Sequence, residues 1–132
     1  MKKTIYYAHH QWKYDTEIEE SELDIIREKL PNYEIINPNK YFYFSEDMTE
    51  EEIMNICLKT VRDCEALVFS SLSGVIGRGV FGEVSLAIEL GKDVYYLHED
   101  DMVEVESVCF RPCKKRSNRT YMVVDHFEIT EE

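Results

Sequence analysis

A single carboxylate stands among small residues in the stretch RGVFGEVSLAIELGK, residues 78–92. Its apolar spacing predicts one helix that ends at Gly91, a residue suited to the turn that closes a helix. In the first turn of this helix, Glu83 has Gly79 four residues before it and Ala87 four residues after it. Small neighbours leave a trough over the backbone, and a helix start attracts anions. The pattern suits a site that holds an anionic ligand group beside a carboxylate.

A structural interpretation of the same residues stays open. An acidic side chain in the first turn of an exposed helix is mildly stabilising through the helix dipole. Glycines at a strand–helix junction often serve tight turns only. The stretch is not a P-loop, because no Gly-Lys-Ser/Thr follows, and it lacks the full G-x-G-x-x-G pattern of dinucleotide-binding proteins.

Length and composition limit the classes of function. The 132 residues fit a single domain, 1–132, with enough chain for a hydrophobic core. A net charge of −12 disfavours a nucleic-acid partner, because Lys and Arg must neutralise phosphates there. No apolar run is long enough to span a bilayer, so we expect a cytoplasmic protein without membrane contact. In that compartment the four cysteines are expected to be free, buried thiols.

The order of predicted elements indicates an α/β fold. Two capping boxes, at Thr16/Glu19 and Thr49/Glu52, mark helix starts. A third helix follows at 78–90, and four strands alternate with these helices. Such a βαβ series predicts a parallel sheet with helices on both faces, a Rossmann-like three-layer sandwich. Residues 107–112 and 120–129 are also predicted strands, flanking a basic hairpin loop at 114–119; one should complete the sheet, and the other is expected at its edge. The four predicted strands are 4–9, 33–37, 66–71 and 93–97.

In folds of this class ligands bind at the carboxyl ends of the strands. Four segments therefore become candidates: residues 8–12, 37–44, 70–79 and 98–101. Two of them are followed by or contain aromatic residues, at Tyr14 and at 41–44, which either wall a slot for a flat ring or belong to the core or a subunit interface. The expected substrate-binding residues are Ala8, His10, Pro38, Asn39, Ser71, Gly77, Arg78 and Gly79.

Three stretches resemble the nucleoside 2-deoxyribosyltransferase-like superfamily, which includes deoxynucleoside monophosphate N-glycosidases. TIYYAH, at 4–9, is similar to the family's opening strand I-Y-x-A-G or A-H-P. CEALVF, at 64–69, is similar to its C-D-A-L-V-A strand. GVFGEVSLAIELGKDVYYL, at 79–97, is similar to G-T-x-x-E-x-G-x-A and the glycine, lysine and strand that follow. The likeness covers most of residues 3 to 97.

The resemblance implies a fold and a chemistry. The family has a flavodoxin-like sheet of order 2-1-3-4-5 and forms dimers or larger homo-oligomers. Its motif glutamate, here Glu83, is the nucleophile that forms a glycosyl-enzyme, and the first-strand tyrosine that contacts it corresponds to Tyr6. The small neighbours of Glu83 would let the sugar lie on the helix start. We expect no cofactor and no metal, and a nucleoside or nucleotide as the small-molecule partner.

The chain also departs from the family pattern. Val80 stands where the family has threonine, and Gly77 where it has an acidic residue or serine. The family's base-handling aspartate falls near Cys57, so leaving-group protonation cannot be carried over. His9, which follows the first strand's alanine, is the best substitute acid because histidine titrates near neutral pH. A hydrogen-bonded structural histidine is an equal alternative.

These observations predict cleavage or exchange of the N-glycosidic bond of a deoxynucleoside or its 5′-monophosphate. Arg78, a residue type that pairs well with phosphate oxygens, favours the nucleotide. The alternative is a non-catalytic nucleotide-binding or signal-binding module on the same fold, which the missing family aspartates favour. Ser70 and Ser73 are further hydroxyls near the expected phosphate position.

Overall fold

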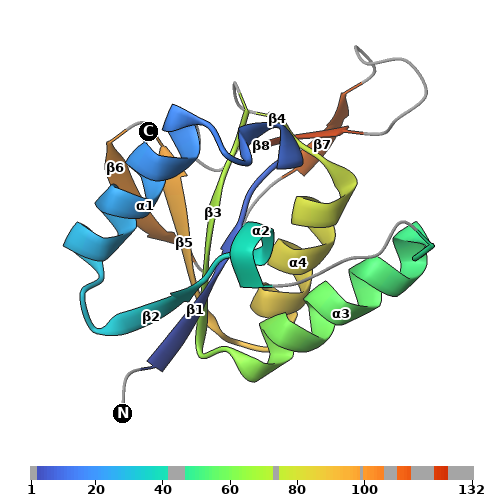
Figure 1. The fold of residues 1–132 in the computed structure, drawn as a ribbon, viewed down its shortest axis with the longest axis horizontal. Helices are drawn as coiled ribbons and strands as arrows, with labels where there is room; N and C mark the ends of the chain where they lie inside the picture. Colours follow the sequence, from blue (N-terminus) through green and yellow to red (C-terminus); the bar gives the residue numbers. More distant parts are fainter. Residues whose placement is uncertain are drawn as a thin grey trace.

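A five-stranded sheet of order β2-β1-β3-β5-β6 forms the centre of the structure, which is a computed structural model (Figure 1). The structure describes residues 3–41, 47–72, 75–98, 100–105, 110–113 and 121–124. Strands β2, β1, β3 and β5 run parallel, and β6 is antiparallel to β5. The elements are β1 (Lys3–Ala8), the 3-10 turn η1 (Gln11–Lys13), α1 (Glu17–Lys29), β2 (Tyr33–Ile36), α2 (Pro38–Tyr41), α3 (Glu50–Asp63), β3 (Ala66–Ser70), β4 (Val75–Ile76), α4 (Arg78–Glu89), β5 (Asp93–His98), β6 (Asp101–Val105), β7 (Phe110–Cys113) and β8 (Tyr121–Val124).

Helices cover both faces of this sheet, so the predicted three-layer α/β architecture is confirmed. When the five strands of the sheet are numbered along the chain, their order is 2-1-3-4-5, as predicted. Helix α1 lies on one face, while α3 and α4 pack together on the other (Figure 1). Alternate residues of β1 supply the two cores, because successive side chains of a strand point to opposite faces. Tyr6 joins the core under α3 and α4, and Tyr7 joins the core under α1. Both tyrosines are fully buried.

The fifth strand of the sheet corrects the sequence-based prediction. The described parts of the two segments predicted to complete it, residues 110–112 and 121–124, are not strands of the main sheet. Strand β6 completes the sheet, because it follows β5 through a short turn and pairs with it from His98↔Asp101 to Val94↔Val105. Strands β7 and β8 instead pair with β4 in a separate antiparallel sheet of order β4-β8-β7. The predicted basic loop at 114–119 lies outside the described residues.

The helix starts largely follow the sequence signals. Thr49 and Glu52 form the predicted capping box, each side chain bonding the other's backbone N–H. The predicted box at Thr16 is only half formed: Thr16 accepts from the Glu19 N–H, but the Glu19 carboxylate accepts from the Asp15 N–H instead. That carboxylate is turned into the protein, where it is 1% exposed. None of the described helices is long and apolar enough to cross a membrane.

Candidate active site

A buried carboxylate and a buried phenol meet at the carboxyl edge of the sheet. The Tyr6 hydroxyl, from β1, donates to Glu83 Oε2 of α4 at 2.5 Å. Glu83 is only 6% exposed, and Tyr6 is fully buried. The thiol of Cys57, on α3, hydrogen-bonds to both groups and is itself buried. Three elements that are far apart in sequence therefore bring a carboxylate, a hydroxyl and a thiol together.

Burial controls the ionisation of this cluster. Loss of solvation raises the pKa of Glu83 to about 7, although the hydrogen bonds from Tyr6 and Cys57 act to lower it. Burial also raises the pKa of the Cys57 thiol to about 11, and that of Tyr6 well above its usual range. Cys57 and Tyr6 are therefore neutral donors near pH 7. Glu83 alone changes charge there, which is a property of functional carboxylates.

The start of α4 differs in one respect from the sequence-based description. Gly77 caps the helix without a side-chain hydrogen bond, and Arg78 is the first helical residue. Glu83 consequently lies in the second turn, and the first turn contains no acidic residue. The helix dipole therefore does less for Glu83 than predicted, since that effect is concentrated in the first turn. Arg78 and Gly79 are exposed at this helix end.

The trough expected beside Glu83 is partly filled by a neighbouring helix. A Cβ at Gly82 would lie 3.2 Å from the terminal methyl of Met54 on α3. A Cβ at Gly79 would be 4.0 Å from the Met54 sulfur, which is ordinary contact. Gly82 thus allows α3 to approach α4 closely, a packing role. Gly79, one turn before Glu83, keeps the helix start open.

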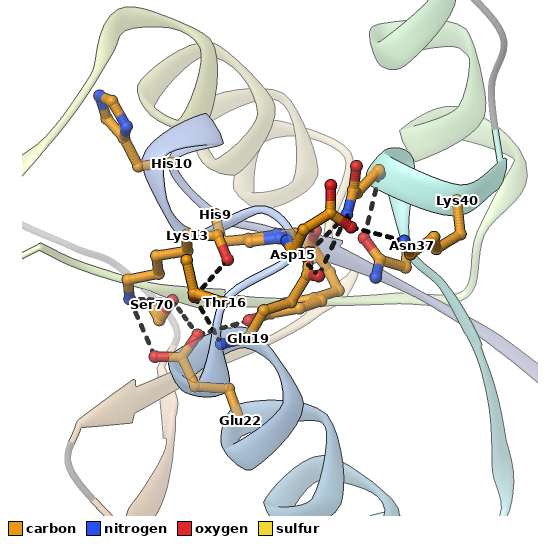
Figure 2. Close-up of polar contacts among 12 residues, drawn as sticks. His9, His10, Lys13, Asp15, Thr16, Glu19, Glu22, Asn37, Lys40 and Ser70 are labelled. Atoms are coloured by element: carbon orange, nitrogen blue, oxygen red, sulfur yellow. Dashed lines mark hydrogen bonds and ion pairs between the residues drawn. The ribbon is translucent and has the colours of Figure 1, made fainter.

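His9 belongs to a second polar cluster, on the other side of β1 (Figure 2). Its Nε2 lies 2.8 Å from Glu19 Oε2, its Nδ1 lies 3.1 Å from the Tyr7 carbonyl oxygen, and its ring stacks on Tyr7. Burial lowers the pKa of His9. Although burial acts to raise it, hydrogen bonds from His9, the Asp15 N–H and Asn39 lower the pKa of Glu19. Both ring nitrogens of His9 are engaged within the protein, which favours the structural alternative for this histidine.

A buried lysine, which sequence reasoning missed, joins the first loop to the end of β3. Lys13 Nζ donates to Glu22 Oε2 at 2.9 Å, to Ser70 Oγ at 2.9 Å and to the Ser71 carbonyl oxygen at 2.8 Å. The hydroxyls of Tyr7 and Ser70 both donate to the other oxygen of Glu22 (Figure 2). All three Lys13 donors are therefore satisfied, as a buried ammonium requires. A lone lysine in a polar loop carries no sequence signal for such burial.

The remaining predicted substrate-binding residues are spread along the same edge of the sheet. Ala8 and Pro38 are buried, and the Asn39 amide donates to Glu19. The ring of His10 packs edge-on against Trp12 and accepts the Trp12 N–H. The Ser71 and Tyr96 hydroxyls lie 2.8 Å apart.

The aromatic residues predicted to form a slot are placed only in part. Tyr14 lies against His9, with ring centroids 4.9 Å apart, and the charge of Glu83 adds to the burial that raises its pKa. Tyr41, at the end of α2, is 61% exposed. Positions 42–44 and Ser73 lie outside the described residues. Tyr14 therefore packs against the His9 cluster and lies within electrostatic range of Glu83.

Comparison with solved structures gives the class of the fold. The chain is similar to a conserved protein from Enterococcus faecalis V583, with a TM-score of 0.60, 17% identity, and 73% of this chain and 63% of that chain covered. It is also similar to a 2-desoxiribosyltransferase from Leishmania mexicana, with a TM-score of 0.50, 21% identity, and coverage of 71% and 63%. The protein therefore shares the fold of these two solved structures, one of which is a 2-desoxiribosyltransferase. It spans less than two thirds of either solved chain.

The sequence comparisons add no closer relationship. No protein-family model matches this chain, and no curated protein matches it.

The raised pKa of Glu83 predicts a pH-dependent effect on stability. A carboxyl with a pKa of about 7 in the folded protein, against 4.5 normally, stabilises the fold below pH 4.5 and loses that contribution as the pH rises through 7. Glu83→Gln cannot ionise, so its free energy of unfolding should match the wild type at pH 5 more closely than at pH 8. At pH 8 we expect it to be more stable by about 1–3 kcal/mol. Urea unfolding at both pH values measures this, and an equal effect at both would contradict it.

Lys13→Met should destabilise the fold strongly. The substitution leaves the Glu22 carboxylate, which is only 14% exposed, without its cation, which costs about 3 kcal/mol. The matched control is Lys40→Met, which removes the exposed ion pair with Asp15 and should cost much less than Lys13→Met. Urea unfolding followed by circular dichroism gives both values. Equal losses would mean that the Lys13 network contributes no more than a surface pair.

Proposed function

We propose that this protein cleaves or exchanges the N-glycosidic bond of a deoxynucleoside or deoxynucleoside 5′-monophosphate, with Glu83 as the nucleophile. The observation that carries the proposal is the Tyr6–Glu83 hydrogen bond. These two residues are 77 positions apart and correspond to the family's tyrosine and nucleophile. The fold common to this chain and the Leishmania 2-desoxiribosyltransferase supports the same substrate class.

The proposed reaction has two displacements at one carbon. An ionised Glu83 oxygen forms a bond to C1′ as the C1′–N bond breaks, and that electron pair leaves with the base, through an oxocarbenium-like transition state. Water, or a nitrogen of a second base, then forms a bond to C1′ and releases the carboxylate. The Tyr6 hydroxyl, which donates to Oε2, holds the carboxylate in one orientation throughout. Such positioning lowers the entropic part of the barrier.

The other predicted residues take positioning roles in this proposal. Arg78, exposed at the first position of α4, is suited to the 5′-phosphate, together with the N–H groups that follow Gly77. We assign no side chain to protonate the leaving base, because His9 uses both ring nitrogens on Tyr7 and Glu19. The base then takes its proton from water.

We also propose that the protein forms a homodimer or larger homo-oligomer. Light scattering during size-exclusion chromatography measures this state.

A non-catalytic nucleotide-binding module is the second candidate. One observation favours it. The family pattern has a base-handling aspartate near position 57, whereas this chain has Cys57, whose thiol interacts with the Glu83 carboxylate. Such a module would bind a nucleotide and form no product.

Substitution of Glu83 by alanine should abolish product formation. We would incubate the protein with deoxynucleosides and their 5′-monophosphates, with and without a second free base, and analyse the products by mass spectrometry. Free base or a base-exchanged product is expected from the wild type and from Glu89→Ala, an exposed change on the same helix. Glu83→Ala should be at least about a thousandfold slower, because the nucleophile is lost. Nucleotide binding without product in the wild type would favour the binding module.

The reaction rate should follow the ionisation of Glu83. Only the carboxylate attacks C1′, and burial raises its pKa to about 7. The single-turnover rate should therefore rise about tenfold between pH 6 and pH 8. Rapid-quench measurement of the base released at each pH gives this profile. A flat profile over that interval would show that Glu83 is not the titrating nucleophile.

A further inference from the structure

Asn37 holds its side chain in one fixed orientation at the carboxyl end of β2. Its Oδ1 accepts the Asn39 N–H at 3.0 Å, and its carbonyl oxygen accepts the N–H groups of Lys40 and Tyr41 at 2.9 and 2.8 Å. These bonds begin the short helix α2. Because Oδ1 faces an N–H donor, turning the amide over would set Nδ2 against that donor. The direction of the Nδ2 hydrogens therefore follows from the backbone.

That Nδ2 group has no acceptor. Across the part of the chain that the structure describes, it is the one buried side-chain polar atom without a hydrogen-bond partner. Asn37 is 8% exposed. A buried amide that lacks a partner loses its hydration without compensation, so folded proteins retain few such groups. The capping of α2 does not explain the choice of Asn, because Ser would supply an acceptor oxygen whose hydroxyl hydrogen can rotate toward a partner, in place of the fixed Nδ2 donor.

Asn37 lies beside the His9 cluster, at the same carboxyl edge of the sheet as the proposed active site. Strand β2 lies next to β1, and Ile36 stands opposite Tyr6, the residue that holds Glu83. Asn37 is thus one residue beyond the level of that pair, on the adjacent strand. Figure 2 shows Asn37 beside Lys40 and Asp15, in the turn that reaches the His9 cluster.

We infer that Asn37 Nδ2 is a ligand-binding donor that takes a hydrogen-bond acceptor at the edge of a nucleobase. This inference rests on the proposed function. Arg78, at the start of α4, follows β3, whereas Asn37 follows β2, and β1 lies between these two strands. If the phosphate lies at Arg78 and C1′ at Glu83, the base extends toward β2. A neutral amide donor suits a carbonyl oxygen or ring nitrogen, whereas phosphate favours cations.

The test compares stability with binding in Asn37→Ser. Serine keeps the capping oxygen and removes Nδ2, so the melting temperature should stay equal or rise. Binding of the preferred deoxynucleoside 5′-monophosphate should weaken by 10- to 100-fold. Isothermal titration calorimetry in the Glu83→Gln protein, which cannot turn over substrate, measures binding of each of the four nucleotides. Asn55→Ser, an exposed change on α3, is the control and should change neither property.

The NMR signal of the Asn37 side-chain amide tests the same group in a protein where Asn37 is not substituted, so the stability of the fold is unaffected. The Asn37 amide resonance is identified by its loss in the Asn37→Ser spectrum. Saturation of the Glu83→Gln protein with the bound nucleotide should move this signal downfield, as a new acceptor does. The test is repeated with analogues that each lack one acceptor of the base, such as the 7-deaza nucleotide if a purine binds. Only the analogue that lacks the acceptor bound by Nδ2 should leave the amide signal at its ligand-free position.

The outcomes separate the two proposals. Normal binding by Asn37→Ser with an unmoved amide signal would overturn the role of Asn37 and leave the proposed function intact. A lowered melting temperature with unchanged affinity would make Nδ2 a structural donor. Binding of none of the four nucleotides by the Glu83→Gln protein, with no product from the wild type, would overturn both proposals.

Discussion

The hydrogen bond between Tyr6 and Glu83 is the constraint on which the rest of the site depends. A carboxylate that is 6% exposed must have donors, because its water has been removed. Tyr6 supplies one from the central strand and Cys57 supplies another from α3. Both donors are neutral, so they orient the carboxylate without a compensating positive charge. This combination leaves Glu83 with a pKa near 7 and allows its charge to change within the physiological range.

The central strand β1 organises two polar clusters on opposite faces of the sheet. Tyr6 points toward α3 and α4, where Glu83 lies, and Tyr7 points toward α1, where Glu22 accepts its hydroxyl. On the α1 face the cationic Lys13 pairs with Glu22, so the negative charge of that carboxylate is neutralised. On the α4 face, within the part of the chain that the structure describes, Glu83 interacts with the neutral Tyr6 hydroxyl and Cys57 thiol and with no basic side chain. The cluster around Lys13 is therefore a neutralised structural network, whereas the carboxylate of Glu83 has no cation to neutralise it.

Two features of the carboxyl edge lower stability in the unliganded protein. Ionisation of the buried Glu83 costs free energy above its raised pKa. The buried Nδ2 of Asn37 loses its hydration without gaining an acceptor. Both features lie at the carboxyl edge of the parallel strands, where this class of sheet binds ligands. A ligand that supplies an acceptor and removes the carboxylate charge would relieve both, which is consistent with the proposed glycosyl transfer.

The sequence alone determined the elements and the identity of the principal carboxylate. Hydrophobic period, capping residues and the Gly91 signal are local, so the parallel strands, the three major helices and their layers follow from them. The contacts between distant residues were decided by the tertiary structure. The Glu19 side chain contacts His9 in place of the predicted capping bond, and Lys13 is buried. Strand β6 forms the edge of the sheet where one of the later predicted strands was expected. Burial and pairing of this kind depend on which faces meet across the sheet, and no single segment carries that information.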